Sequence, residues 1–128
     1  MDDTSKYLAL FVSEANAHVA ELWGGIGSLC AAEFQPQLID ELFRHAHSIK
    51  GMAAAMGFEE ITALARAAEL LLGKLREQRR VPPPPLDQIL LAGAARLSEM
   101  IRAREVGESL PPAPQLASAI EQASADVA

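Results

Sequence analysis

Apolar residues recur along the first quarter of the chain in alternating steps of four and three. They are Leu8, Val12, Ala15, Val19, Leu22, Ile26 and Leu29. Because an α-helix places residues at these spacings on one face, the pattern predicts a long helix with one apolar side. Three glycines, Gly24, Gly25 and Gly27, follow its middle. Each costs about 1 kcal/mol relative to alanine inside a helix, so we expect a kink or an early end there.

Two more helical stripes follow. The first begins after Pro36, which suits the first turn of a helix, and Gly57 can end it in the left-handed conformation. Its apolar positions are Ile39, Leu42, Ala46, Ile49, Ala53 and Met56. The second begins near Glu59. Its apolar positions are Ile61, Leu64, Ala68, Leu71 and Leu75. The break between the two stripes is short, so these helices should pack antiparallel.

Prolines divide the rest of the chain. Residues 82–85 are four prolines, which favour a stiff extended spacer. A proline-rich ligand is the alternative, but no clear recognition pattern repeats here. A fourth helix follows, with an apolar stripe of Leu86, Leu90, Leu97 and Met100. After the prolines of 111–114, residues 115–127 can form a short fifth helix, although alanine and serine give it little apolar area.

Together these patterns predict an all-α protein. Four amphipathic helices with short connections form an up-and-down antiparallel four-helix bundle, here with a short fifth helix at the carboxyl end. The low aromatic content, 5%, and the many alanines and leucines agree with helices rather than sheet. We expect one domain over residues 1–106, and a segment rich in proline and alanine over 107–128 that leads into a linker.

Charge and cysteine content narrow the classes of partner. The net charge of −6 opposes binding to nucleic acid, whose phosphates require a basic surface. Cys30 is the single cysteine, so it forms no internal disulfide. The uncharged run over 22–32 is far shorter than the roughly 20 residues of a membrane span, and no basic, apolar leader opens the sequence. These features favour a cytoplasmic protein without membrane insertion.

One histidine stands off the apolar stripe of the second predicted helix. At 100° per residue, His47 lies about 130° from the centre of that stripe, so core packing does not explain it. Lys50, Phe43 and Ala54 share its side of the helix. Gly51, one turn later, leaves no side chain above the imidazole. We therefore expect an exposed histidine beside a cation, open to close approach by another protein.

A glutamate on the third predicted helix is the candidate partner of this histidine. Glu69 falls between inward positions, and in an antiparallel pair of helices its edge can border that of His47. A carboxylate that accepts the proton of one ring nitrogen fixes the tautomer and raises the basicity of the other nitrogen. Lys50 can offset the negative charge of an incoming phosphoryl group. The three side chains would thus have separate chemical roles.

Spacing alone does not establish a function, because a lone surface histidine followed by a lysine most often belongs to a solvated helix face. His45 points about 160° away from His47, so the two cannot chelate one metal or act on one substrate. We interpret His45 as a structural or surface residue. His18 lies beside the first stripe without an acidic or cysteine companion at ligand spacing, and we expect it to be partly buried. The sequence shows no metal-site signature.

Residues 43–51, FRHAHSIKG, resemble the phosphoacceptor helix of the amino-terminal histidine phosphotransfer domain in chemotaxis histidine kinases of the CheA type. The core of this motif, HSIKG at 47–51, is specific. Residues 7–15, YLALFVSEA, resemble the opening helix of that domain, and residues 67–71, AAELL, resemble its carboxylate-bearing third helix. The resemblance covers about residues 5–103 and implies a helical phosphotransfer domain.

By matched position, the resemblance implies that His47 is the phosphorylated residue, Lys50 the lysine on the phosphate side, and Glu69 the residue that orients the imidazole. One position departs from the family. Arg66 stands where the family commonly has a second histidine, and it can either hold the phosphate or pair with Glu69. We also expect contacts to the phosphate or to a partner from Arg44, Gly51, Ala54 and Arg66.

The resemblance predicts a phosphohistidine carrier. A kinase domain elsewhere on a longer chain would transfer the γ-phosphoryl group of ATP to His47, and an aspartate of a CheY-like response regulator would then take it. The sequence has neither a glycine-rich nucleotide loop nor an acidic cluster for Mg²⁺. We therefore expect no cofactor in this domain, which is no enzyme by itself, with ATP and Mg²⁺ held by the separate kinase domain.

Two alternatives come from other classes of protein. The first is a helical adaptor that docks a response regulator through the face carrying Gly51 and Ala54 without being phosphorylated. The second is a free enzyme with His47 as general base, although neither pocket-forming loops nor a nucleophile accompany it. The tail rich in proline and alanine favours a kinase fragment over a stand-alone relay protein.

Overall fold

The computed structural model describes residues 3–30, 33–108, 110 and 114–127, and these residues contain helices but no strand. The helices are α1 (Asp3–Leu29), α2 (Pro36–Met56), α3 (Glu59–Gln78), α4 (Leu86–Val106) and α5 (Pro114–Asp126). The predicted all-α class, the four main helices and the short fifth helix are confirmed. No helix in the described part of the chain is both long and apolar enough to cross a membrane.

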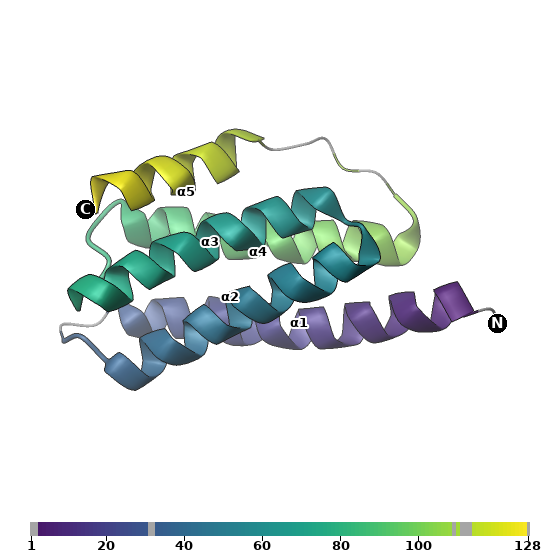
Figure 1. Cartoon of the computed structure of the whole chain (residues 1–128), viewed down its shortest axis with the longest axis horizontal. Coiled ribbons are helices and arrows are strands. Elements are labelled where there is room, and N and C mark those ends of the chain that lie inside the picture. Colours follow the sequence, from purple (N-terminus) through teal and green to yellow (C-terminus); the bar gives the residue numbers. More distant parts are fainter. Residues whose placement is uncertain (1–2, 31–32, 109, 111–113, 128) are drawn as a thin grey trace.

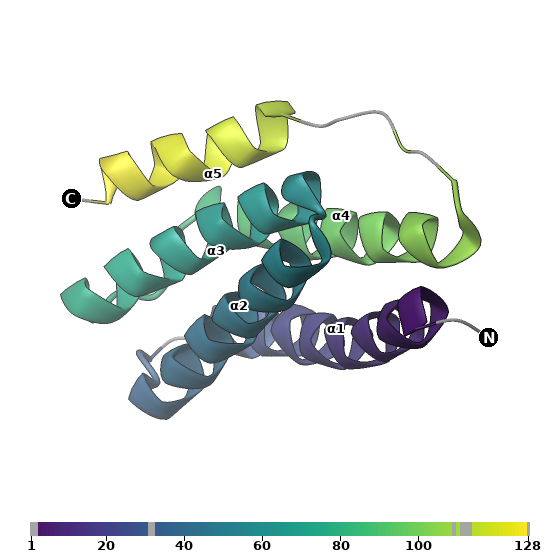
Figure 2. The same cartoon turned by 45° about the vertical axis from the view of Figure 1, so that its right-hand side comes forward.

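Helices α1 to α4 run alternately up and down and form the predicted bundle (Figure 1). Helix α1 packs against α2 and α4, and α3 packs against the same two helices. Helix α5 lies outside this bundle, along α3 and α4, in both views (Figures 1 and 2). It buries Ile120 and Ala123. The division of the chain after residue 106 stays a prediction.

The predicted apolar stripes form the core. Among the largest side chains that are fully buried are Leu22, Ile26, Ile39, Ile49, Leu71 and Leu97. Helix α2 ends where the stripe predicts, at Gly57, which has a φ of 75° and donates its N–H to the carbonyl groups of Ala53 and Ala54. Because Gly57 and Phe58 alone separate α2 from α3, these two helices fold back as antiparallel neighbours.

Of the kink or early end expected for α1, the early end is wrong, because the helix continues through its glycines to Leu29, and the kink stays a prediction. Tertiary packing explains this result. A Cβ atom on Gly25 would lie 2.3 Å from Cδ2 of Leu42, a buried residue of α2. The missing side chain therefore lets α2 approach the backbone of α1, and burial of the shared core compensates for the low helix propensity of glycine.

The proline segment between α3 and α4 is also different from the expected extended spacer. The peptide bond between Pro84 and Pro85 is cis, and the N–H of Leu86 donates to the carbonyl of Pro83 at 2.7 Å. This hydrogen bond closes a turn, as antiparallel α3 and α4 require a reversal of the chain. Pro82 is buried, so the segment packs on the bundle rather than standing away from it.

Candidate functional site

The exposed edge between α2 and α3 carries His47. Its neighbours Ala46 and Ile49 are fully buried, whereas the side chain of His47 is 64% exposed. The side chain of His47 therefore takes no part in the core, as the helical pattern predicts. Gly51 lies on the same face, and a Cβ atom placed on it would meet nothing within 4 Å. This leaves open space on the carboxyl-terminal side of the imidazole.

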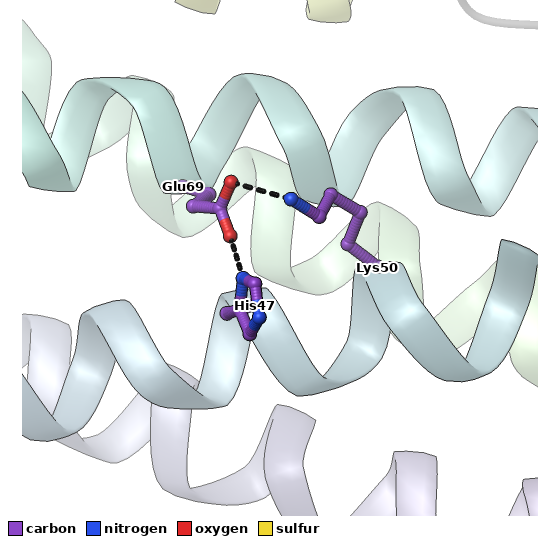
Figure 3. Close-up of polar contacts among 3 residues, drawn as sticks. All are labelled: His47, Lys50 and Glu69. Atoms are coloured by element: carbon purple, nitrogen blue, oxygen red, sulfur yellow. Dashed lines mark hydrogen bonds and ion pairs between the residues drawn. The ribbon is translucent and has the colours of Figure 1, made fainter.

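Helix α3 places a carboxylate directly against the ring of His47 (Figure 3). The Nδ1 atom of His47 lies 2.5 Å from Oε2 of Glu69. An ionised carboxylate can only accept a hydrogen bond, so Nδ1 carries the proton and donates it. The lone pair of the imidazole then lies on Nε2, which points away from Glu69. Glu69 thus fixes the tautomer and orients the ring.

Lys50 holds the other oxygen of the same carboxylate. Its Nζ atom donates to Oε1 of Glu69 at 2.8 Å, from the same helix as His47 (Figure 3). The Lys50 side chain is 25% exposed and that of Glu69 is 14% exposed, so this pair is screened less by water than a surface ion pair. Lys50 therefore anchors Glu69, a contact that the spacing along the sequence does not predict.

The charge state of Glu69 follows from these contacts. Burial by itself raises the pKa of the carboxyl group, but the hydrogen bonds from Lys50 and His47 and their electrostatic attraction outweigh it, and the pKa lies below the ordinary value for glutamate. Glu69 is consequently ionised at neutral pH. A fixed negative charge beside Nδ1 stabilises the positive charge that the imidazole gains when Nε2 bonds to an electrophile.

The remaining candidate residues lie on the exposed faces of α2 and α3. Arg44 and Ala54 are exposed on α2, one turn before and two turns after His47. Arg66 is exposed on α3 and lines a groove together with Phe43 and Glu69. Within the described part of the chain, Arg66 forms no ion pair with Glu69, whose two oxygens are held by His47 and Lys50. Contacts of these residues with a phosphate or a partner stay predictions.

A second contact of His47 was missed at the level of sequence. The rings of Phe43 and His47 are nearly parallel, with an interplanar angle of 11° and centroids 6.4 Å apart. On α3, the guanidinium carbon of Arg76 lies 4.1 Å from the centre of the Phe43 ring. The helical spacing places Phe43 beside His47, but the part played by Arg76 depends on how α3 packs against α2.

The opposite side of α2 holds a pair of histidines. The Nδ1 atoms of His18 on α1 and His45 on α2 lie 2.8 Å apart, so one donates a hydrogen bond to the other. His18 is partly buried, as expected, but its pairing with His45 was not foreseen. Burial, and then the neighbouring His18, lower the pKa of His45 against the opposing effect of Glu21 and Glu41. No group of three or more potential metal ligands comes together in the described residues.

Comparisons with known proteins give one consistent result. Residues 6–126 match the family model of the Hpt domain. The chain is 34% identical over 98 residues to the chemotaxis protein CheA of Listeria monocytogenes. The aligned region covers 77% of this chain but only 16% of that protein. It is 42% identical over 77 residues to the chemotaxis protein CheA of Halobacterium salinarum, covering 60% of this chain and 11% of that protein.

A solved structure has the same fold. The phosphorylated P1 domain of CheA3 in complex with CheY6 from R. sphaeroides superimposes on 97% of this chain and 99% of its own, with a TM-score of 0.84 at 19% sequence identity. At this identity the likeness supports the fold. It includes α5, because nearly the whole chain is covered.

Proposed function

Because the chain belongs to the Hpt domain family, we propose that it carries a phosphoryl group on Nε2 of His47. The group would come from ATP on the catalytic domain of a CheA-type histidine kinase and pass to an aspartate of a CheY-like receiver domain. The observation that supports this most directly is the hydrogen bond from Nδ1 of His47 to Glu69, which leaves the Nε2 lone pair free at an exposed edge.

The proposed chemistry needs two displacements at phosphorus. In the first, the Nε2 lone pair attacks the γ-phosphorus of ATP, the bond to the bridging oxygen breaks, and ADP leaves. The imidazole becomes positively charged, and ionised Glu69 stabilises it through Nδ1–H. In the second, an aspartate oxygen attacks the same phosphorus, the bond to Nε2 breaks, and the lone pair returns to the neutral ring.

The chain would act as substrate and carrier, with catalysis supplied by its partners. It spans 16% and 11% of the length of the two relatives compared above, so the activity of such whole proteins is a proposal for this chain. We propose that ATP and Mg²⁺ bind to a separate kinase domain. The phosphotransfer domain described here would need no cofactor of its own. Lys50 would support the reaction by holding Glu69 in place through its hydrogen bond. Contact between Lys50 and the phosphate stays a prediction.

A receiver domain has an apolar surface available on the α1 side of α2. Between α1 and α2, a groove of about 370 Å³ is lined mainly by apolar side chains, among them Tyr7, Leu10, Met52 and Met56. Tyr7 and Leu10 are more than half exposed. The solved relative is described as phosphorylated and in complex with CheY6. The same groove favours the second candidate, an adaptor that binds a regulator without being phosphorylated.

Labelling distinguishes the two candidates. The chain is incubated with a CheA-type catalytic domain and radiolabelled ATP, and acid-labile, base-stable phosphate is measured on wild type, His47→Gln and His45→Gln. Label on wild type and His45→Gln, with none on His47→Gln, supports the relay. Label that persists on His47→Gln contradicts it. No label on the chain beside a labelled control substrate, together with binding to a receiver domain, supports the adaptor.

A further inference from the structure

The hydrogen bond to Glu69 leaves one degree of freedom of His47 undetermined. It restrains the distance between Nδ1 and Oε2, but the χ1 and χ2 torsions of His47 can change together and tilt the ring while that distance is kept. The Nε2 lone pair lies in the plane of the ring, so the tilt of that plane decides where the nucleophile points. Displacement at phosphorus requires the lone pair to be in line with the bond that breaks, so a second restraint would accelerate the reaction.

Phe43 supplies a surface of the right orientation. It precedes His47 by one helical turn, and its ring lies within 11° of parallel to the imidazole. Offset parallel rings at a centroid distance of 6.4 Å fall within the range in which aromatic pairs attract each other. Tilting of the exposed imidazole out of this arrangement loses that contact. Phe43 is therefore suited to restrain the tilt that Glu69 leaves free.

Helix α3 in turn holds the ring of Phe43. Arg76 lies over the ring, with its guanidinium carbon 4.1 Å from the centroid, and its Nη1 atom reaches Oδ1 of Asp40 at 3.4 Å. Asp40 is one turn before Phe43 on α2. At the edge of the ring, Gly73 has no side chain, and a Cβ atom there would lie 3.3 Å from Cε2 of Phe43. Phe43 thus fits into a slot built by Gly73 and Arg76.

We propose that Phe43 is a positioning residue for phosphotransfer, which sets the plane of the His47 imidazole and is itself held by Gly73 and Arg76. This inference rests on the proposed function of His47. Glu69 would determine which nitrogen is nucleophilic, and Phe43 would determine where that nitrogen points. The two restraints come from different chemical interactions, so they can be removed separately.

The test compares initial rates of phosphorylation, at saturating ATP, among Phe43→Leu, Phe43→Tyr and wild type. Phe34→Leu is the matched control, because Arg79 lies over the Phe34 ring at 5.0 Å in a similar arrangement away from His47. We expect Phe43→Leu to lower kcat about three- to tenfold with little change in the KM for the carrier domain. Phe43→Tyr, which keeps the ring, should restore the rate, and Phe34→Leu should match wild type.

A spectroscopic measurement separates positioning from general loss of structure. The ¹⁵N shifts of the His47 imidazole should move in Phe43→Leu toward those of a freely turning histidine, while backbone amide shifts of α4 remain in place. A Phe43→Leu rate equal to wild type, or a Phe43→Tyr rate as low as that of Phe43→Leu, would overturn the inference. If wild type takes no label, the proposed function fails, and the ¹⁵N shifts still test whether Phe43 positions the ring.

A second variant applies if Phe43→Leu does not fold. Gly73→Ala favours the helix, because alanine has the higher helix propensity, but its methyl group must displace the Phe43 ring by a few tenths of an ångström. The control is Gly24→Ala, where a Cβ atom meets nothing within 4 Å. Slower phosphorylation of Gly73→Ala at unchanged or higher thermal stability supports the positioning role. A rate equal to that of Gly24→Ala overturns it.

Discussion

Helix α2 carries two histidines that face opposite neighbours and have opposite partners. His47 donates to a carboxylate, Glu69 of α3, whereas His45 shares a hydrogen bond with another imidazole, His18 of α1. A carboxylate can only accept, so it fixes the proton of His47 on Nδ1 and leaves Nε2 as the nucleophile. Burial, and then the neighbouring imidazole of His18, favour the neutral form of His45 by lowering its pKa. The neighbouring helix, rather than the residue type, decides the chemistry of each ring.

This difference assigns one edge of α2 to reaction and the other to structure. At the α3 edge, an ionised carboxylate prepares a nucleophile that is exposed to partners. At the α1 edge, burial and the neighbouring His18 lower the pKa of His45, so that ring is held neutral. The comparison can be tested by changing the partner on each side and measuring the same two properties, phosphorylation rate and stability.

Replacement of the carboxylate should have the largest effect. Glu69→Gln keeps the size of the side chain but removes the charge, and an amide accepts or donates, so both imidazole tautomers become possible. We expect initial phosphorylation to slow by about 10- to 100-fold, as is typical when the partner of a functional histidine is removed. Glu41→Gln, near His45, is the matched control and should keep the wild-type rate. Equal rates for the two variants would refute the role of Glu69.

Removal of the Lys50 ammonium group should slow phosphorylation of His47 less than removal of the Glu69 charge does. In Lys50→Ala, Oε1 of Glu69 loses its donor, and the pKa of Glu69 should rise toward its ordinary value. We expect phosphorylation to slow about three- to tenfold. A ¹³C titration of the carboxyl group measures the pKa, and Lys50→Arg, which keeps a donor, should retain most of the rate. An unchanged Glu69 titration in Lys50→Ala would show that Lys50 does not anchor the carboxylate.

Protonation of His45, at the α1 edge, should have the smallest effect of the three and should change stability alone. Because the pKa of His45 is lower in the folded chain than in the unfolded chain, the unfolded state binds more protons as pH falls. Stability is then complete above the unfolded value, near 6.5, and decreases as pH falls from there toward the folded pKa. We expect Tm to fall by about 1–3 °C over this interval, since the group is partly solvated.

A variant attributes that pH dependence to the histidine pair. In His45→Gln, the change of Tm between neutral and mildly acidic pH should become smaller, while phosphorylation of His47 stays at the wild-type rate. Calorimetry at a series of pH values measures the first and labelling measures the second. A Tm profile that is identical to that of wild type would assign the titration to another group.

Sequence periodicity predicted the helices and the exposure of His47 because both depend on one face of one helix. The contacts that define the site required more information. The reach of Lys50 to Glu69, and of Arg76 to Phe43, depends on the register of α3 against α2. The helical edges already made Glu69 the candidate partner of His47, and the resemblance to phosphotransfer domains gave it the same role. A contact outside the familiar motif, such as that of Arg76, had no counterpart in either.

Tertiary packing also explains where the predictions from the sequence were wrong or incomplete. Helix propensity marks the glycines of α1 as an end, but Gly25 lies against Leu42 of α2 and the helix continues. Similarly, His18 and His45 each look ordinary on their own helices, and they become a pair only because α1 and α2 pack with these two positions opposite each other. Local rules are reliable here for single elements, and they fail where two helices meet.

The two-residue connection at Gly57 has an evolutionary consequence. One residue inserted there must either distort the left-handed turn at Gly57 or lengthen α3 at its start, which would turn the rest of that helix by about 100° and carry Glu69 away from His47. Gain or loss of residues at this point should therefore be strongly selected against. The proline turn between α3 and α4 bears no such constraint, because its length leaves the α2–α3 pair untouched. Among descendants of this sequence, length changes should therefore accumulate in the turn at 80–85 and be rare at 57–58.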